Sequence, residues 1–329
     1  MDKNIMHLFI LNPISFWNMW KQTQVLNRIQ SFFSTIDNND YAIHISRFPR
    51  DAASFIPVFA RALPKGTVLR VYAIGGDGIL FDCLNGVMGI ENAELASIPY
   101  GRTNDFIRGF GKNEDVFFKR LALQYNAPTI PLDVIRCGDN YALSHCVIGI
   151  EAEIARSVGK IREKMQKSNS LSQWLARKLN ILLYYFSVFS VFTDNRLMRQ
   201  QYELDIDGER LTGVYLGLQI FNSPYINEWH PVKNALPNDG LLDMIVPHRQ
   251  GKRQVFRMFP LFFPGNKKTL PKHFIYKQLR KISVASNTIL RVNLDGIVFF
   301  ENGLELELLP SAVRFVDATR RGYKGAGDD

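Results

Sequence analysis

A glycine-rich turn at residues 75–78 constrains this chain more than any other stretch. The sequence Gly75-Gly76-Asp77-Gly78 follows an apolar run at 67–74 that is typical of a buried strand, and apolar residues then recur at helical spacing. Glycines at such a junction let the backbone approach a ligand closely, and a helix N-terminus directs N–H groups at an anion. The turn therefore predicts a phosphate-binding site in an α/β domain.

Asp77 lies inside this turn. A carboxylate alone would repel phosphate, and a cation such as Mg²⁺ between the two groups removes that repulsion. The turn thus indicates a site for phosphate and metal together. The alternative is an ordinary glycine-rich turn with a solvated aspartate.

The first 127 residues alternate between apolar strands and amphipathic helices. These elements are expected at 5–11, 17–32, 42–46, 51–63, 67–74, 79–88 and 95–98. The alternation predicts a parallel sheet with helices on both faces. Two more loops of turn-forming residues, 12–15 and 99–106, also follow strands. Ligands on such sheets bind at the carboxyl ends of the strands, so we expect these loops to join the glycine turn in one site.

From about residue 128 the pattern changes to short strands separated by turns. They are expected at 129–136, 141–149, 201–206, 214–221, 241–246, 281–286, 289–294 and 304–309. This pattern is typical of antiparallel hairpins and predicts a β-sandwich. A helical insertion at 154–192 interrupts the strands.

Basic residues outnumber acidic ones by 40 to 31, a formal net charge of +9. They concentrate at 156–178 and at 249–281, where ten basic residues and no acidic ones alternate with aromatic side chains. Such a mixture suits the headgroup region of an anionic membrane. Nucleic acid would accept the same pattern, and a solvated basic face over an aromatic core explains it as well.

The sequence gives little support to several other classes of protein. Neither G-x-G-x-x-G nor G-x-x-x-x-G-K-[ST] occurs, which argues against a dinucleotide fold and a P-loop. The three cysteines have no C-x-x-C spacing, so we expect a reducing, cytoplasmic setting without a zinc site or disulfide framework. The longest apolar run, 181–192, is shorter than the roughly 20 residues of a membrane-spanning helix.

Six motifs, taken in order, resemble those of the diacylglycerol kinase and sphingosine kinase family of lipid kinases, with NAD kinases as more distant relatives. The motifs are Asn12-Pro13-Ile14-Ser15, Gly75-Gly76-Asp77-Gly78 with Asp82 and Asn85-Gly86, Pro99-Tyr100-Gly101-Arg102-Thr103-Asn104-Asp105-Phe106, Gly149-Ile150-Glu151, Asp239-Gly240-Leu241-Leu242-Asp243 and Asp295-Gly296-Ile297.

The resemblance implies an N-terminal α/β domain like that of phosphofructokinase and NAD kinase, and a C-terminal antiparallel β-sandwich. We therefore expect a nucleotide-binding catalytic domain at 1–127, a lipid-substrate domain at 128–308, and a segment, 309–329, that returns to the first domain. It also implies an ATP site in the cleft between the domains, and a lipid hydroxyl that receives the γ-phosphate.

The resemblance assigns roles residue by residue. Asp77 would hold Mg²⁺ with ATP or serve as the catalytic base. Asp239 would join a metal-linked acidic network, and Asp295 would contact the reacting hydroxyl or phosphate. The implied nucleotide-binding residues are Asn12, Ser15, Gly75, Gly76, Asp77, Gly78, Gly101, Arg102, Thr103, Asn104 and Asp105.

Four positions depart from the family pattern. Phe16 stands where a glycine usually lies, Ile79 and Arg102 replace small hydroxyl residues, and Ile297 replaces the glutamate of Asp-Gly-Glu. The guanidinium of Arg102 either clamps a phosphate or fills the space that a nucleotide needs. Ile297 removes a carboxylate from the implied centre of chemistry.

We therefore predict a diverged, Mg²⁺-dependent lipid kinase that transfers the γ-phosphate of ATP to a diacylglycerol-like or sphingoid lipid in phospholipid metabolism. The alternatives are a degenerate relative that binds nucleotide or lipid without turnover, and a kinase of a non-lipid substrate. We expect a cytoplasmic protein at the surface of an anionic membrane and no nucleic-acid partner. A homodimer is compatible with the sequence.

Overall fold

The structure is a computed structural model that describes residues 4–13, 19–101, 103–150, 152–154, 156–157, 200–226, 230–247 and 274–326. Ser15, Phe16, Arg102, nearly all of the expected helical insertion and residues 249–273 of the basic segment lie outside the described residues. The chain forms two compact units. Unit 1 contains Met1–Ser144, Asn222–Leu241 and Leu308–Asp329, and unit 2 contains His145–Phe221 and Leu242–Glu307.

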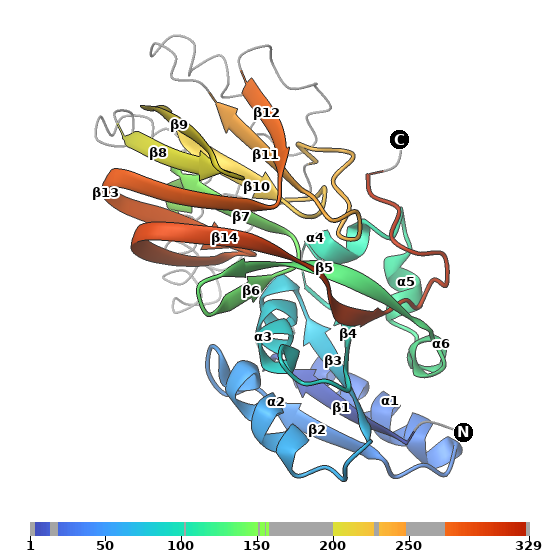
Figure 1. Cartoon of the computed structure of the whole chain (residues 1–329). Coiled ribbons are helices and arrows are strands. Elements are labelled where there is room, and N and C mark those ends of the chain that lie inside the picture. Colours follow the sequence, from blue (N-terminus) through green and yellow to red (C-terminus); the bar gives the residue numbers. More distant parts are fainter. Residues whose placement is uncertain are drawn as a thin grey trace, which may run out of the picture. The chain divides into compact units, whose positions relative to one another are not determined.

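Unit 1 is built on a parallel sheet (Figure 1). Its strands are β1 (Ile5–Leu11), β2 (Tyr41–Ile45), β3 (Val68–Gly75) and β4 (Ala93–Pro99). They lie in the order β2-β1-β3-β4, and every neighbouring pair is parallel. The last part of β14 (Ile297–Val316) adds one more parallel contact, at Phe315 opposite Leu95 of β4. The expected parallel sheet is confirmed.

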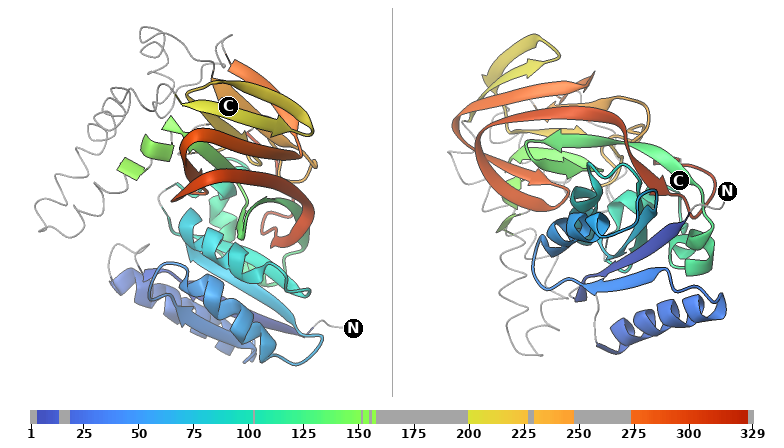
Figure 2. Two further views of the ribbon diagram at one scale, coloured as in Figure 1. Left: turned by 60° about the vertical axis from the view of Figure 1, so that its left-hand side comes forward. Right: turned by 60° about the horizontal axis from the view of Figure 1, so that its bottom comes forward.

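Helices cover both faces of this sheet, as Figures 1 and 2 show. They are α1 (Met19–Thr35) on one face, and α2 (Asp51–Arg61) and α3 (Asp77–Val87) on the other. Successive residues of a strand point to opposite faces. Leu8 and Ile10 of β1 accordingly join the core under α2 and α3, and Phe9 and Leu11 join the core under α1.

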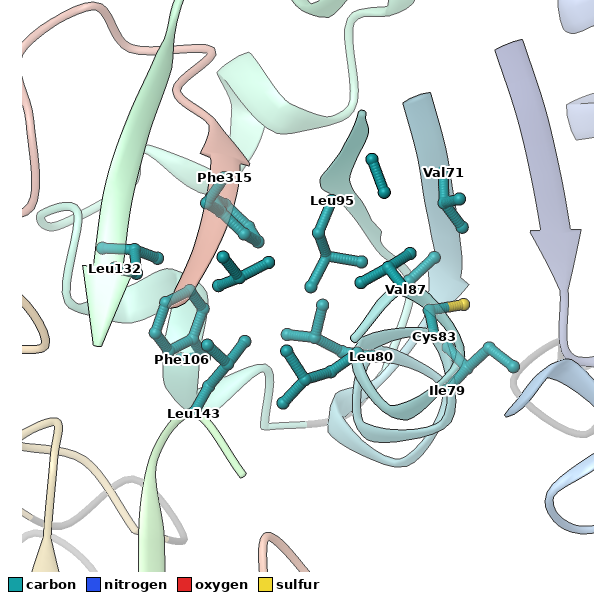
Figure 3. Packing of buried hydrophobic residues seen from close by; sticks show 14 of the residues in the cluster. Val71, Ile79, Leu80, Cys83, Val87, Leu95, Phe106, Leu132, Leu143 and Phe315 are labelled. Atoms are coloured by element: carbon teal, nitrogen blue, oxygen red, sulfur yellow. The ribbon is translucent and has the colours of Figure 1, made fainter. Parts of the chain in front are cut away.

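The core under α3 anchors the helix that follows the glycine turn. Figure 3 shows Ile79, Leu80, Cys83 and Val87 on the side of α3 that faces the sheet and its neighbours. Ile79 is 2% exposed. The departure from the family pattern at this position is therefore accommodated in the hydrophobic core.

Three short helices follow β4, namely α4 (Asp105–Arg108), α5 (Asp115–Phe118) and α6 (Leu121–Tyr125). Arg70, a buried residue of β3, fixes the last of them. Its Nε donates to Glu94 at 2.7 Å, and its Nη1 donates to the carbonyl oxygens of Gln124 and Tyr125 at 2.9 and 2.8 Å. The buried guanidinium is thus paired and at the same time satisfies carbonyl groups at the end of α6.

The first unit extends past the boundary at 127 that the sequence pattern indicated. Strands β5 (Thr129–Cys137) and β6 (Asn140–Ala142) both belong to unit 1. Leu132 and Leu143 lie in its core, and the buried side-chain amide of Asn222 donates to the carbonyl oxygens of Asp133 and Leu143 at 2.9 and 2.8 Å. The sequence pattern changes to short strands at about residue 127, but the chain continues to pack within unit 1 up to residue 144.

Unit 2 is antiparallel throughout its described part (Figure 1). It contains β7 (His145–Gly149), β8 (Gln201–Ile206), β9 (Glu209–Val214), β10 (Gly217–Phe221), β11 (Leu242–Pro247), β12 (Phe274–Leu279), β13 (Lys281–Leu294) and the first part of β14. Strands run in the order β12-β11-β10-β7-β13, and β13 also pairs with β8 and β14. This confirms the antiparallel organisation expected for the second half.

Three details of unit 2 differ from the sequence-based expectation. Residues 209–214, of which only 214 was expected in a strand, form β9 and pair with β8. Residues 281–294 form one strand whose register shifts between Ala285 and Leu290, because an irregularity there does not end the pairing. Residues 274–279, expected only as part of the basic segment, form β12 against β11.

Candidate phosphate-binding site

The loops after β1, β3 and β4 meet at the carboxyl edge of the parallel sheet. The chain passes from β1 outward to β2 and then returns to β3 on the other side of β1, so the strand order reverses between β1 and β3. At this point the N–H of Asn12 donates to the carbonyl oxygen of Ile74 at 3.2 Å. Ligands of open α/β sheets bind where the strand order reverses in this way.

The glycine turn and the loop after β4 contact each other through their backbones. The N–H groups of Tyr100 and Gly101 both donate to the carbonyl oxygen of Gly75, at 2.8 and 3.0 Å. A Cβ atom on Gly101 would stand 2.3 Å from the Cα atom of Gly76. Only glycine at position 101 permits this approach.

Asn104 holds the loop after β4 in shape. Its Oδ1 accepts from the N–H of Gly101 at 3.1 Å, and its Nδ2 donates to the carbonyl oxygen of the same residue at 2.9 Å. The backbone of Asn104 is left-handed, with φ 48°, a conformation that asparagine tolerates better than most residues. Because both ends of its amide form hydrogen bonds within the loop, Asn104 shapes the site, and one N–H and one acceptor position of the amide are left for a ligand.

Asp77 is the first residue of α3 and lies beside the loop after β4. Its Oδ2 accepts from the hydroxyl of Thr103 at 3.0 Å and from the N–H of Asp105 at 3.2 Å. Its Oδ1 accepts no hydrogen bond from the part of the chain that the structure describes. One oxygen is thus fixed by the neighbouring loop, and the other remains available to a cation or a proton.

The N-terminus of α3 fits a phosphate group. The N-cap residue, Gly76, provides no side-chain hydrogen bond to the first turn, so the orphan N–H groups there are not capped by this residue. A Cβ atom on Gly78 would meet no atom of the described residues within 4 Å, so these residues leave open space over the turn. Helix N–H groups, a favourable dipole and open space are the features that bound phosphates require.

A metal ion would need more ligands than the chain itself supplies. No group of three or more His, Cys, Asp or Glu side chains among the described residues is arranged to hold one. Mg²⁺ is commonly held by one or two carboxylates together with phosphate oxygens and water. The available oxygen of Asp77 fits that mode of binding.

Asp82 and Asn85, which belong to the same family motif, have structural partners. The Asp82 carboxylate accepts from the N–H of Arg50 at 3.1 Å, and burial raises the pKa of this carboxyl group. The Asn85 amide donates to the carbonyl oxygen of Tyr141 and accepts from its N–H, at 2.8 and 3.0 Å. These two residues join α3 to the start of α2 and to β6.

Asp239, the second metal ligand expected from the sequence, lies on an exposed loop of unit 1. One of its carboxylate oxygens accepts from the N–H of Leu241 at 3.0 Å. The loop is fixed by Asp133, a buried acid that the sequence reasoning missed, which accepts from the N–H groups of Gly240 and Ser311, both at 2.8 Å. The available signal was a carboxylate directly between apolar residues, Leu132 and Val134, of an expected strand.

Asp295 belongs to unit 2, at the turn between β13 and β14. Its carboxylate accepts from the N–H of His145 at 2.8 Å, and its own N–H donates to the carbonyl oxygen of His145 at 3.1 Å. Both side chains are buried. Sequence reasoning named Asp295 but gave His145 no role.

The structure brings together Gly75, Gly76, Asp77, Gly78, Gly101, Thr103, Asn104 and Asp105, and it places Asn12 at the neighbouring strand end. Ser15 and Arg102 lie outside the described residues, so their roles stay predictions.

Two family models match the chain along almost its whole length. The model of the diacylglycerol kinase catalytic domain matches residues 7–137, and the YegS C-terminal NAD kinase beta sandwich-like domain matches residues 148–317, more than half of the chain. The chain belongs to the diacylglycerol kinase-like family. The resemblance inferred from the motifs is confirmed, and so is the combination of an N-terminal α/β domain with a C-terminal β-sandwich.

Named relatives and solved structures agree with this family. The chain is 24% identical over 255 residues to a candidate lipid kinase of Staphylococcus epidermidis, covering 76% of this chain and 77% of the relative. It is 23% identical to a diacylglycerol kinase of Bacillus subtilis, covering 69% and 70%. A crystal structure of a diacylglycerol kinase from Bacillus anthracis matches the fold with a TM-score of 0.64 and 18% identity, covering 96% and 97%.

None of the helices in the described ranges is both long and apolar enough to cross a bilayer.

Proposed function

We propose that this protein is a lipid kinase that transfers the γ-phosphate of ATP, with Mg²⁺, to a hydroxyl group of a diacylglycerol-like or sphingoid lipid. The observation that carries this proposal is Asp77, held by Thr103 at the uncapped N-terminus of α3 beside the open space over Gly78. Family membership adds to it, since a diacylglycerol kinase catalytic domain matches the part of the chain that contains this turn.

Phosphoryl transfer depends mainly on positioning and on neutralisation of negative charge. The N–H groups at the start of α3 would bind a phosphate, and the available oxygen of Asp77 would hold Mg²⁺ against it. Bound Mg²⁺ supplies charge neutralisation and orients the phosphates. Thr103 and the N–H of Asp105 would keep the Asp77 carboxylate in one orientation, and Asn104 would keep their loop in contact with the glycine turn.

Asp77→Asn tests this assignment, because it keeps the size of the side chain and removes its charge. Labelled γ-phosphate would be followed into diacylglycerol, monoacylglycerol, sphingoid and ceramide acceptors in mixed micelles over a Mg²⁺ series. We expect the variant to lose at least 100-fold in kcat/KM, a typical effect of removing a charged group from an active site. Asp139→Asn, which changes an exposed acid in the turn between β5 and β6, is the matched control.

The enzyme proposal fails if the unaltered protein labels none of these acceptors. The alternative function, a relative that binds nucleotide without turnover, then predicts that ATP or ADP with Mg²⁺ raises the thermal unfolding temperature. The loss of the family carboxylate at Ile297 is the specific observation that favours this alternative. Absence of a shift at millimolar nucleotide would exclude both functions.

We also propose that the protein works at the surface of an anionic membrane from the cytoplasmic side. The support is the basic and aromatic composition of residues 249–281. In the described part of that segment, Lys277 pairs with Glu209 and Lys281 pairs with Glu305. Binding to vesicles that contain phosphatidylserine should weaken as salt rises. Binding that salt leaves unchanged would contradict this part of the proposal.

A further inference from the structure

Thr103, in the loop after β4, is held by hydrogen bonds at both ends. Its hydroxyl donates to Oδ2 of Asp77 at 3.0 Å, and its carbonyl oxygen accepts from Nε of Arg108 at 2.8 Å. All three residues belong to unit 1. The side chain of Arg108 therefore contacts the residue that orients the proposed metal ligand.

The backbone of α4 by itself does not hold the Thr103 carbonyl. The helix begins at Asp105 with Asn104 as its N-cap, and the N–H of Arg108 donates to the carbonyl oxygen of Asn104 at 3.2 Å. That is the first carbonyl that a helix engages, and the carbonyl of Thr103 lies one residue earlier. Arg108 thus secures two successive carbonyl groups of the loop, one with its N–H and one with its guanidinium.

Arg108 projects from a helix that is anchored in the core. Phe106 and Ile107, the two residues before it, are buried. Phe106 packs against Phe315 with the ring centroids 5.2 Å apart, as Figure 3 shows. A helix of four residues has little stability of its own, so this packing fixes the backbone of α4. The arginine side chain then links the fixed helix to the Thr103 carbonyl.

We propose that Arg108 is a positioning residue for Asp77. By fixing the Thr103 carbonyl, it keeps the Thr103 hydroxyl on Oδ2 of Asp77, so that Oδ1 stays available to a cation bound with phosphate. This assignment rests on the proposed lipid kinase function and adds to it the residue that supports the metal ligand. Arg108 acts through Thr103 and not by contact with the lipid.

Loss of the arginine should weaken metal binding more than lipid binding. Without a donor to its carbonyl, Thr103 can turn, and the Asp77 carboxylate then keeps only the N–H of Asp105, at 3.2 Å, of the two donors that the described residues give it. Groups that orient a metal ligand typically change metal affinity or activity by about 10- to 100-fold when they are removed. The effect should therefore appear in the Mg²⁺ dependence.

The first measurement compares Arg108→Met with the unaltered full-length protein over a Mg²⁺ series. Methionine keeps an unbranched side chain that favours a helix, but it donates no hydrogen bond. We expect kcat to fall about tenfold and the Mg²⁺ concentration at half-maximal rate to rise at least about threefold, with the KM of the lipid changed less than about twofold.

Two further variants frame this result. Arg108→Lys should recover part of the loss, because an ammonium group can still donate to the Thr103 carbonyl. Arg61→Met is the matched control, since Arg61 is exposed and is also the last residue of its helix, α2. We expect the control to keep the Mg²⁺ dependence of the unaltered protein.

A double-mutant cycle tests the route through Thr103. Thr103→Val keeps the shape of the side chain and removes the hydroxyl that contacts Asp77. If Arg108 acts through that hydroxyl, Arg108→Met should reduce kcat by no more than about twofold once Thr103→Val is present. Independent effects, with the full tenfold loss in both backgrounds, would overturn the proposal.

A third measurement reads the site without turnover. Calorimetry would give the affinity for ATP with and without Mg²⁺, for the unaltered protein, Arg108→Met and Arg108→Lys. We expect Arg108→Met to weaken ATP binding about tenfold with Mg²⁺ and less than about twofold without it. Equal weakening under both conditions would show that the arginine only supports the fold of the loop, and would overturn its positioning role. If Arg108→Met fails to fold, the same comparison in Arg108→Lys decides the matter.

The proposal and the proposed function fail in different ways. Unchanged Mg²⁺ dependence and turnover in Arg108→Met would overturn the role of Arg108 while lipid phosphorylation itself remained intact. Absence of phosphorylation in the unaltered protein would overturn the kinase function, and the calorimetric comparison would still decide whether Arg108 supports the Mg²⁺ site. Absence of any ATP binding would overturn both.

Discussion

Gly101 lies against Gly76 so closely that a Cβ atom on Gly101 would stand 2.3 Å from the Cα atom of Gly76. This contact joins the loop after β4 to the glycine turn at the start of α3, backbone to backbone. It therefore determines how Thr103 and Asp105 reach the carboxylate of Asp77.

Gly101→Ala should damage both the fold and the site. The added methyl group meets backbone, which cannot move aside as a flexible side chain could. We expect the free energy of unfolding to fall by about 1–3 kcal/mol in urea titrations, and nucleotide affinity to fall at least tenfold by calorimetry. A variant with unaltered affinity would show that the contact between the two loops does not position the site.

Gly78→Ala separates stability from binding. Position 78 lies in the first turn of α3, and the new methyl group meets no atom within 4 Å in the part of the chain that the structure describes. We expect the unfolding free energy to stay equal or rise by up to about 1 kcal/mol, because alanine favours the helix. Affinity for ATP should nevertheless fall at least tenfold, since the methyl group occupies the space of the phosphate. Unchanged affinity would place the phosphate elsewhere.

Asn104 should act through its loop rather than through a ligand. Asn104→Gly removes the side-chain amide but still adopts the left-handed backbone readily. Asn104→Ala removes the amide and also disfavours the left-handed backbone. We expect both variants to bind nucleotide more weakly, with Asn104→Ala less stable than Asn104→Gly by about 1–2 kcal/mol. If Asn104→Gly bound nucleotide normally but lost nearly all turnover, the side chain would instead contact the reacting groups.

Acid should destabilise unit 1 through His7. Burial, with the nearby charge of Arg70, lowers the pKa of His7 from 6.5 to about 3 in the folded protein. Between these values the unfolded chain binds a proton that the folded chain does not, so stability is full above about pH 6.5 and declines as the pH falls toward 3. The limit is on the order of 5 kcal/mol, since one pKa unit corresponds to about 1.4 kcal/mol. Urea titrations between pH 7 and pH 4 should show a shallower decline for His7→Gln than for the unaltered protein.

The C-terminal segment should support the loop that contains Asp105. The N–H groups of Lys324 and Gly325 donate to the carbonyl oxygen of Gly109, at 2.9 and 3.0 Å. A Cβ atom on Gly109 would overlap the Tyr323 hydroxyl at 1.9 Å. Gly109→Ala should therefore destabilise the protein, and adding Tyr323→Leu should recover part of the loss. Strictly additive effects in this double-mutant cycle would contradict the packing of Tyr323 under Gly109.

The sequence by itself determined the strands and helices of the first 99 residues and their order, but not the three short helices α4, α5 and α6 that follow. Apolar periodicity and turn residues are local signals, so they locate the strand before Gly75, the helix after Gly78 and the three loops at the strand ends. The position of the Asp77 turn between a strand and a helix follows from the same signals. The motifs added the family, because their order along the chain is itself a property of the sequence.

Only the tertiary structure decided which groups within the site are engaged and which are available. Both ends of the Asn104 amide form hydrogen bonds within its own loop, whereas Asp77 keeps one oxygen open, and no local pattern distinguishes these two polar side chains. His145 meets Asp295 although 150 residues separate them in the chain. Such contacts arise when strands distant in sequence pair, so their partners are set by packing and not by the residues nearby.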